Sequence, residues 1–293
     1  MAYYWGFELA ESLISVSDDR VEDGSLNKSE DASCLVFCSA GERIFTLDWL
    51  QGLQSRENFA TAIVYYGKDP VAPPQTDYFL QNTDFKIPNF LALIAKYPEV
   101  LEYDYYIFID DDIQIESDAF STWLSAAMIN ELAVSQPALT ADSRADWPHL
   151  KQQALDIDFG QFVEVQCFMI SRNILRLALP FFYMIKTGTG LDIIIYLLCS
   201  RHKSRMGVLH NIPVNHPYRD DELTVRRQFT SFGVFNQRLS RSIEFCFEED
   251  PLEALAFLSN NIGDTRYGFV RFYASCKFVF DRLIRKIRKI MGN

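Results

Sequence analysis

Three adjacent aspartates follow a run of five apolar residues in this chain. Residues Tyr105–Ile109 read YYIFI, and Asp110, Asp111 and Asp112 come directly after them. Such a run predicts a buried β-strand, and three carboxylates at its end repel one another unless a cation is held there. Hard divalent cations such as Mg²⁺ and Mn²⁺ prefer carboxylate oxygens as ligands. The triplet therefore predicts a metal site.

The three carboxylates are expected to have different roles. Alternate side chains of a strand point to opposite faces, so Asp110 and Asp112 share one side if the strand persists, and Asp111 faces away. We assign Asp112 to the metal and Asp110, more loosely, to the ribose or to a metal-bound water. A second interpretation stays open: Ser117 and Asp118 precede an apolar segment, so the acids could cap a helix.

The elements before the triplet alternate between strands and helices. Short apolar runs predict strands, helical spacing of apolar residues predicts helices, and the Pro-containing stretch 71–84 is expected to be a loop. This alternation predicts a parallel sheet with helices on both faces, whose ligand site lies beyond the carboxyl ends of the strands. The loops at Gly41, Gly67 and the triplet should therefore converge on one ligand. The predicted strands are 34–41, 60–67 and 103–110, and the predicted helices are 43–54 and 88–102.

The second half of the chain has a more mixed pattern. No GxGxxG or GxxxxGK[ST] motif occurs, so dinucleotide-binding and P-loop folds lack their signatures. A helix over 172–185 should break or end near Pro180. The other predicted elements are strands at 133–139, at 162–171 with Glu164 turned inward and at 206–216, helices at 119–132 and from Leu191, and a polar loop at 140–158.

Composition limits the class of protein. The 293 residues are 48% hydrophobic, enough for one large or two small domains, and the net charge of −11 argues against a nucleic-acid partner. Six cysteines without a CxxC pair predict reduced, buried thiols. The N-terminus lacks a basic start and apolar stretch, so no signal peptide is expected. The apolar runs 177–185 and 191–199 are shorter than the roughly 20 residues of a spanning helix. We expect a cytoplasmic protein.

The C-terminal segment differs in charge from the rest. Between Arg266 and Asn293, eight basic residues face one acid, a net charge of +7. Apolar residues recur there at three-and-four spacing, with the basic residues off that stripe, which is typical of a helix lying on an anionic membrane surface. Packing of this helix on its own domain is the alternative. We expect three segments: 1–32 with an acidic loop, a catalytic domain at 33–250, and a membrane-associating segment at 251–293.

The order of motifs resembles a known family. The segment YDYYIFIDDDI looks like the DXD segment of nucleotide-sugar-dependent glycosyltransferases of the GT-A fold, and the TGTG loop at 187–190 followed by Asp192 is similar to their acceptor-side loop and catalytic acid. In NIPVNHPYR, His216 follows a strand, where the family often has a third metal ligand. With its SQPAL and GLD segments, the chain resembles most a poorly characterised branch of plants and bacteria.

The resemblance implies a fold, a reaction and a set of site residues. It implies a GT-A-like α/β domain that uses Mn²⁺ or Mg²⁺ to move a sugar from a nucleotide-sugar donor to a glycan or lipid-linked acceptor, with inversion, in surface polysaccharide synthesis. The basic C-terminal segment adds the expectation that the protein lies on the inner face of the cell membrane. The resemblance places the nucleotide and its ribose at the strand ends. The implied donor contacts are Ser39, Ala40, Tyr66, Gly67, Lys86, Asp110 and Asp111; the metal ligands Asp112, Asp110 and His216; the base Asp192; and the acceptor contacts Glu164, Gly188 and Gly190.

Several alternatives remain at this stage. Asp192 could be a helix N-cap after Gly190, His216 a turn residue, and Glu164 a buried, satisfied side chain. His149 lies in a loop that could reach the acceptor. The family often has a second acid before its base, where this chain has Leu191. The rival activities are a metal-dependent nucleotidyl or phosphoryl transferase and a non-catalytic membrane-bound scaffold of the same fold.

Overall fold

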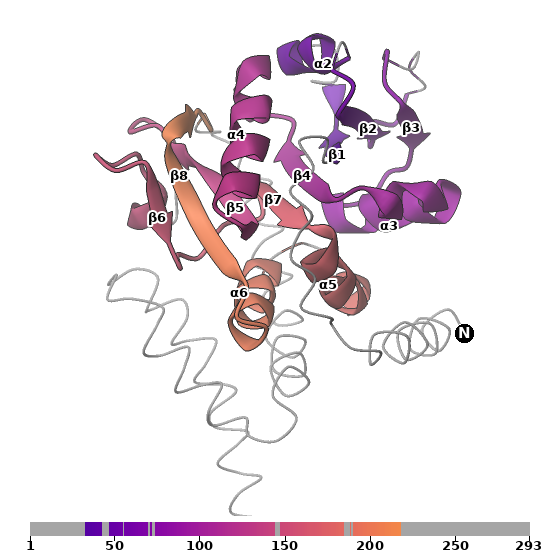
Figure 1. Cartoon of the computed structure of the whole chain (residues 1–293). Coiled ribbons are helices and arrows are strands. Elements are labelled where there is room, and N and C mark those ends of the chain that lie inside the picture. Colours follow the sequence, from indigo (N-terminus) through magenta and orange to yellow (C-terminus); the bar gives the residue numbers. More distant parts are fainter. Residues whose placement is uncertain are drawn as a thin grey trace, which may run out of the picture.

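The computed structural model describes residues 33–42, 47–54, 56–69, 71, 74–143, 147–184, 188 and 190–217. The predicted segments 1–32 and 251–293 lie outside these residues, as does the end of the predicted catalytic domain. The described chain forms an eight-stranded sheet with helices on both faces (Figure 1). The strands are β1 Cys34–Ala40, β2 Phe59–Tyr65, β3 Tyr78–Gln81, β4 Tyr105–Asp110, β5 Leu132–Leu139, β6 Ile157–Phe159, β7 Cys167–Ser171 and β8 Arg205–Val214.

The helices form two layers, which follow from alternation along the strands. Leu35 and Phe37 of β1 pack toward α3, α5 and α6, whereas Val36 and Cys38 pack toward α2 and α4 (Figure 1). Both faces of the central strands are therefore buried. The helices are α2 Asp48–Leu53, α3 Lys86–Lys96, α4 Ser117–Ile129, α5 Arg172–Met184 and α6 Leu191–Arg201, with short 3₁₀ helices η2 Pro98–Glu102 and η3 Pro148–Leu150.

The strand order is β3-β2-β1-β4-β7-β5-β8-β6. The first four strands in this order are parallel, as predicted, and β5 and β8 are parallel to each other. Only β7 and the edge strand β6 run antiparallel to their neighbours. The carboxyl ends of β1, β2, β4, β5 and β8 consequently share one edge of the sheet, and β7 begins at that edge. The mixed α/β fold class is confirmed.

Five predicted elements differ from the structure. The helix predicted over 88–102 is α3 as far as Lys96 and then η2, and the loop predicted over 140–158 contains η3 and the start of β6. The stretch 71–84 is not all loop, because Tyr78–Gln81 pair with β2 as β3. The strand predicted over 162–171 begins only at Cys167, because the preceding residues turn across the sheet edge. The helix α5 neither breaks nor ends at Pro180 but continues to Met184.

Two further expectations concern cysteines and membrane spans. Cys34, Cys38, Cys167 and Cys199 are buried free thiols, as predicted, and burial raises their pKa values, so they stay protonated. Among the described residues, no helix combines the length and apolarity needed to cross a membrane.

Candidate active site

The acidic triplet forms a turn rather than a continued strand. β4 ends at Asp110, and Ile113 donates its N–H back to the Asp110 carbonyl at 3.2 Å. The triplet does not cap the next helix, because α4 begins at Ser117 and its N-cap, Glu116, makes no side-chain capping bond. The predicted alternation of side chains does not apply past Asp110, and each carboxylate has its own partners.

Asp111 connects three strand ends. Its Oδ2 accepts hydrogen bonds from the Gly41 N–H at 2.9 Å and from the Tyr66 hydroxyl at 3.1 Å. A Cβ on Gly41 would lie 2.7 Å from the Tyr66 ring, so glycine lets that ring approach. The loops after β1, β2 and β4 therefore converge, as the sequence predicted. The structure gives Asp111 contacts that hold these loops together.

Asp112 and His216 meet although 104 positions separate them. His216 Nε2 lies 3.3 Å from Asp112 Oδ2, and both side chains are largely buried, at 12% and 7% exposed. The loop after β5 holds the backbone in place, since His216 donates its N–H to Ser143 Oγ at 2.9 Å. The Nδ1 of His216 is buried without a hydrogen-bond partner among the described residues.

This pair suits a divalent metal in its chemistry and spacing. Two ligand atoms at about 2.1 Å from an octahedral ion lie about 3 Å apart, close to the observed separation. No group of three or more His, Cys, Asp or Glu side chains suited to a metal occurs in the described part of the chain. Asp112 and His216 therefore fit a Mg²⁺ or Mn²⁺ site completed by substrate phosphates and water, and do not fit a closed all-protein site.

Asp110 is paired with a lysine. Lys86, the first residue of α3, places its Nζ 2.5 Å from Asp110 Oδ1 and 2.5 Å from the Val165 carbonyl oxygen. Burial raises the pKa of Asp110 and the nearby Asp112 adds to the rise, whereas Lys86 and His216 oppose it. The resemblance implied that Lys86 contacts the donor. In this structure its ammonium contacts Asp110 and the Val165 carbonyl oxygen.

The remaining predicted donor residues surround the ends of β1 and β2. Ser39 Oγ accepts a hydrogen bond from Asn89 Nδ2 at 2.7 Å, and Asn89 is fully buried on α3. Ala40 is buried and its carbonyl accepts the Tyr66 N–H at 2.9 Å. The Gly67 carbonyl accepts a bond from Gln81 at 3.3 Å. Sequence reasoning missed Asn89, although a polar residue on the apolar face of a predicted helix was a usable signal.

The predicted acceptor residues lie at the start of α6 and before β7. Gly188 and Gly190 have positive φ angles of 76° and 86°, which favour glycine. Gly190 is the N-cap of α6, so Asp192 is a first-turn residue and not the cap, and its Oδ1 accepts the Ile193 N–H at 2.9 Å. Glu164 is buried, with Oε2 2.5 Å from Gln166 Nε2.

These residues adjoin the acidic turn through Val165. A Cβ on Gly188 would lie 3.7 Å from the side chains of both Ile87 and Val165, and the Val165 carbonyl binds Lys86. His149 Nε2 lies 2.8 Å from the carbonyl oxygen of Phe162, in the residues that precede β7. The structure thus brings the Gly188 loop to the residues that hold Asp110.

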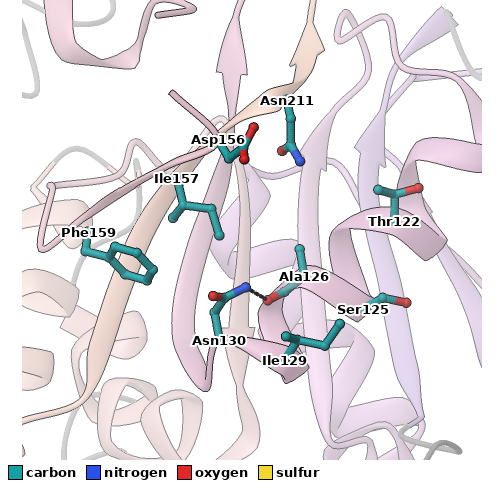
Figure 2. Close-up of a pocket in the computed structure, with 9 residues that line it drawn as sticks. All are labelled: Thr122, Ser125, Ala126, Ile129, Asn130, Asp156, Ile157, Phe159 and Asn211. Atoms are coloured by element: carbon teal, nitrogen blue, oxygen red, sulfur yellow. Dashed lines mark hydrogen bonds between the residues drawn. The ribbon is translucent and has the colours of Figure 1, made fainter. Parts of the chain in front are cut away.

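A separate hollow lies away from this edge. Figure 2 shows a groove of about 580 Å³ between α4, the β6 region and β8, lined by Ile129, Phe159, Asp156 and Asn211 among others. None of the predicted site residues lines it. The candidate active site is therefore the edge that carries Asp112 and His216, and not this groove.

Comparison with known proteins supports the same class of fold. No protein-family profile matches the chain, and no curated protein matches it in sequence. Its fold is GT-A-like, a mixed α/β sheet with helices on both faces. The structure of S. aureus TarS residues 1–349 in complex with UDP-GlcNAc is similar at a TM-score of 0.50 and 10% identity, over 72% of this chain and 66% of that one.

Two further TarS structures show how much of that protein the chain spans. A second structure of S. aureus TarS 1–349 gives a TM-score of 0.47 at 9% identity, over 72% of this chain and 65% of that one. The longer TarS structure gives 0.46 at 9% identity, over 75% of this chain and 44% of that one. The chain thus spans less than half of the longer TarS structure. The likeness at a TM-score of 0.50 supports a GT-A-like fold and does not distinguish the plant and bacterial branch.

Proposed function

We propose that this protein is a divalent-metal-dependent glycosyltransferase that moves a sugar from a nucleotide-sugar donor to a hydroxyl of a glycan or lipid-linked acceptor in surface polysaccharide synthesis. The observation that carries this proposal is the buried Asp112–His216 pair at the carboxyl edge of a GT-A-type fold. The TarS neighbour in complex with UDP-GlcNAc favours a nucleotide sugar as donor.

The donor would lie over the ends of β1, β2 and β4, which we call the donor side. Asp112 and His216 would hold Mn²⁺ or Mg²⁺, which neutralises charge on the leaving nucleoside diphosphate when bound. Ser39, Ala40, Tyr66 and Gly67 would contact the base and ribose. Lys86 and Asp110, already paired, would face the diphosphate and the water around the metal.

The acceptor would approach from one side of this edge, which we call the acceptor side. It is formed by Glu164–Gln166, Gly188, Gly190 and Asp192. Asp192 would accept the proton of the acceptor hydroxyl as the oxygen attacks the anomeric carbon, which is general-base catalysis. A single base on the acceptor side implies direct displacement with inversion. Glu164 and the two glycines would contact acceptor hydroxyls.

The first test is a calorimetric titration of UDP and GDP into the full chain, with Mn²⁺ and with EDTA. We expect binding that requires metal and that is lost in Asp112→Asn. Asp118→Asn is the control, because Asp118 is an exposed acid that pairs with Arg56 away from the pair. If no nucleoside diphosphate, CDP included, binds with metal present, the proposal is wrong. Metal-dependent binding without release of sugar from any donor would favour a nucleotidyl or phosphoryl transferase.

We also propose that the C-terminal segment holds the enzyme on the inner face of the cell membrane. The support is its sequence alone, with basic residues beside an apolar stripe. The full chain should co-sediment with vesicles containing phosphatidylglycerol and not with neutral vesicles. Equal binding to both kinds of vesicle would contradict the proposal. The matched variant replaces the basic residues with glutamine: Arg282, Arg285, Lys286, Arg288 and Lys289.

A further inference from the structure

Gln136 is a buried amide in the middle of the sheet. It lies on β5, has no exposed surface, and its Oε1 accepts the Glu164 N–H at 2.6 Å. This bond fixes the orientation of the amide, because only the oxygen can accept. The Nε2 group has no hydrogen-bond partner among the described residues. A buried donor without a partner costs stability, so an apolar side chain would suit this position better if packing were its only role.

The segment that Gln136 holds carries two contacts to the acidic turn. The Val165 carbonyl accepts a bond from Lys86 Nζ at 2.5 Å, and the Gln166 carbonyl accepts the Asp110 N–H at 2.9 Å. Residues Glu164–Gln166 precede β7 and belong to no strand or helix. The position of this segment therefore depends on individual hydrogen bonds, and the bond from the Glu164 N–H to Gln136 anchors it to β5.

We propose that Gln136 is a positioning residue: through the Glu164–Gln166 segment it sets where Lys86 and Asp110 lie relative to the Asp112–His216 pair. Its functional consequence rests on the proposed function. Without the Gln136 oxygen, the buried Glu164 N–H would lack an acceptor, and the segment would shift to reach another one. That shift moves the Val165 carbonyl away from Lys86. The Lys86 ammonium then loses one of its two acceptors.

The test compares Gln136→Met with Ser135→Ala in the full chain. Methionine has nearly the length of glutamine and accepts hydrogen bonds only weakly. Ser135, the preceding residue, is fully buried and its Oγ accepts the Trp123 Nε1–H at 2.8 Å, toward α4 rather than toward the site. Each variant removes one buried hydrogen bond from β5. Thermal unfolding first confirms that both are folded and gives their loss of stability.

Two readouts then separate positioning from stability. The first is the rate at which acetic anhydride acetylates Lys86, measured by mass spectrometry with Lys96 as internal reference. The second is the Kd for UDP with Mn²⁺. We expect Gln136→Met to raise the acetylation rate of Lys86 at least three-fold and the Kd about ten-fold, and Ser135→Ala to change neither. If Gln136→Met does not fold, Gln136→Asn withdraws the amide by one methylene and takes its place.

Each outcome tests a different part of the inference. Equal acetylation of Lys86 in the two variants overturns the inference. Faster acetylation with an unchanged Kd, in a wild type that binds UDP, overturns the functional part of it. A wild type that binds no nucleoside diphosphate refutes the proposed function, whereas the acetylation comparison still decides whether Gln136 positions Lys86.

Discussion

The donor side and the acceptor side of the sheet edge are held together by different means. On the donor side, three parallel strands end next to one another, and one carboxylate, Asp111, binds the loops after β1 and β2. On the acceptor side, the chain reaches the antiparallel strand β7 through Glu164–Gln166, which belongs to no strand, and enters α6 through two glycines with positive φ.

This difference indicates how each side should respond to an amino-acid substitution. The parallel ladder fixes the donor side, so a single lost contact there should weaken ligand binding without displacing the backbone. The acceptor side depends on single side chains and special backbone angles, so small changes there should alter the placement of reacting groups. Variants of the donor side should therefore change Kd, and variants of the acceptor side should change turnover. Gln136→Met should also change Kd, because the segment that it displaces contacts Lys86 on the donor side.

The largest expected effect tests whether the two sides are separable. Asp192→Asn removes the proposed base and keeps the shape of the side chain, so the rate of sugar transfer should fall about 10²- to 10⁴-fold. The Kd for UDP with Mn²⁺ should stay within about two-fold, because the role proposed for Asp192 is to contact the acceptor and not the nucleotide. Steady-state kinetics and calorimetry on one preparation give both values. A variant that loses nucleotide binding instead would contradict the division into two sides.

The second prediction uses two glycines with nearly the same backbone angle. Gly188 and Gly160 have φ of 76° and 74°, so alanine at either position should cost about 1 kcal/mol in free energy of unfolding. Gly188→Ala should also lower the rate of transfer about ten-fold, because Gly188 adjoins Val165. Gly160→Ala, with no atom within 4 Å of the new Cβ, should leave that rate unchanged. Equal rates in the two variants would show that the loop does not place the acceptor.

A smaller effect is expected on the donor side. Tyr66→Phe removes the hydroxyl that donates to Asp111, a bond that contributes about 1 kcal/mol, so the Kd for UDP should rise a few-fold while turnover at saturation stays the same. Tyr103→Phe is the matched control. The Tyr103 hydroxyl makes a hydrogen bond of the same 3.1 Å length to the Tyr78 hydroxyl, and Tyr103 precedes β4, at the end of the strand opposite Asp111. If both variants raise the Kd equally, the bond between Tyr66 and Asp111 has no special role in UDP binding.

The sequence allowed the donor side to be predicted better than the acceptor side. Apolar runs that end at small or acidic residues mark β1, β2 and β4, and their loops converge as parallel topology requires. The strand β3 was missed because Tyr78–Gln81 is short and follows prolines. The strand at 162–171 was drawn too long, because a continuous apolar pattern cannot show where a chain leaves the sheet.

Apart from the pair of Asp112 and His216, the contacts between individual side chains could not be predicted from the sequence. The convergence of Asp112 with His216 followed from the family's order of motifs, and the structure brings them to 3.3 Å. The pairing of Lys86 with Asp110 depends on how α3 begins relative to the turn, which no spacing encodes. Gln136 lies inside an ordinary strand pattern, so only the contact with Glu164 reveals it.

The smallest expected effect concerns pH and the acceptor side. Burial lowers the pKa of His149 below its ordinary 6.5, although the Phe162 carbonyl and Asp158 oppose the shift. The unfolded chain then binds a proton at a higher pH than the folded chain, so stability is greatest above pH 6.5 and falls as the pH drops from there toward the lowered pKa.

His149→Gln should reduce this pH dependence in urea unfolding between pH 7.5 and 5.5. It should not abolish it, because burial also lowers the pKa values of His202 and His210. UDP binding at pH 7.5 should be unaffected, since His149 contacts Phe162 before β7 and no donor-side loop. An unchanged pH slope would mean that His149 titrates alike in both states, and that the loop it holds opens before the sheet unfolds.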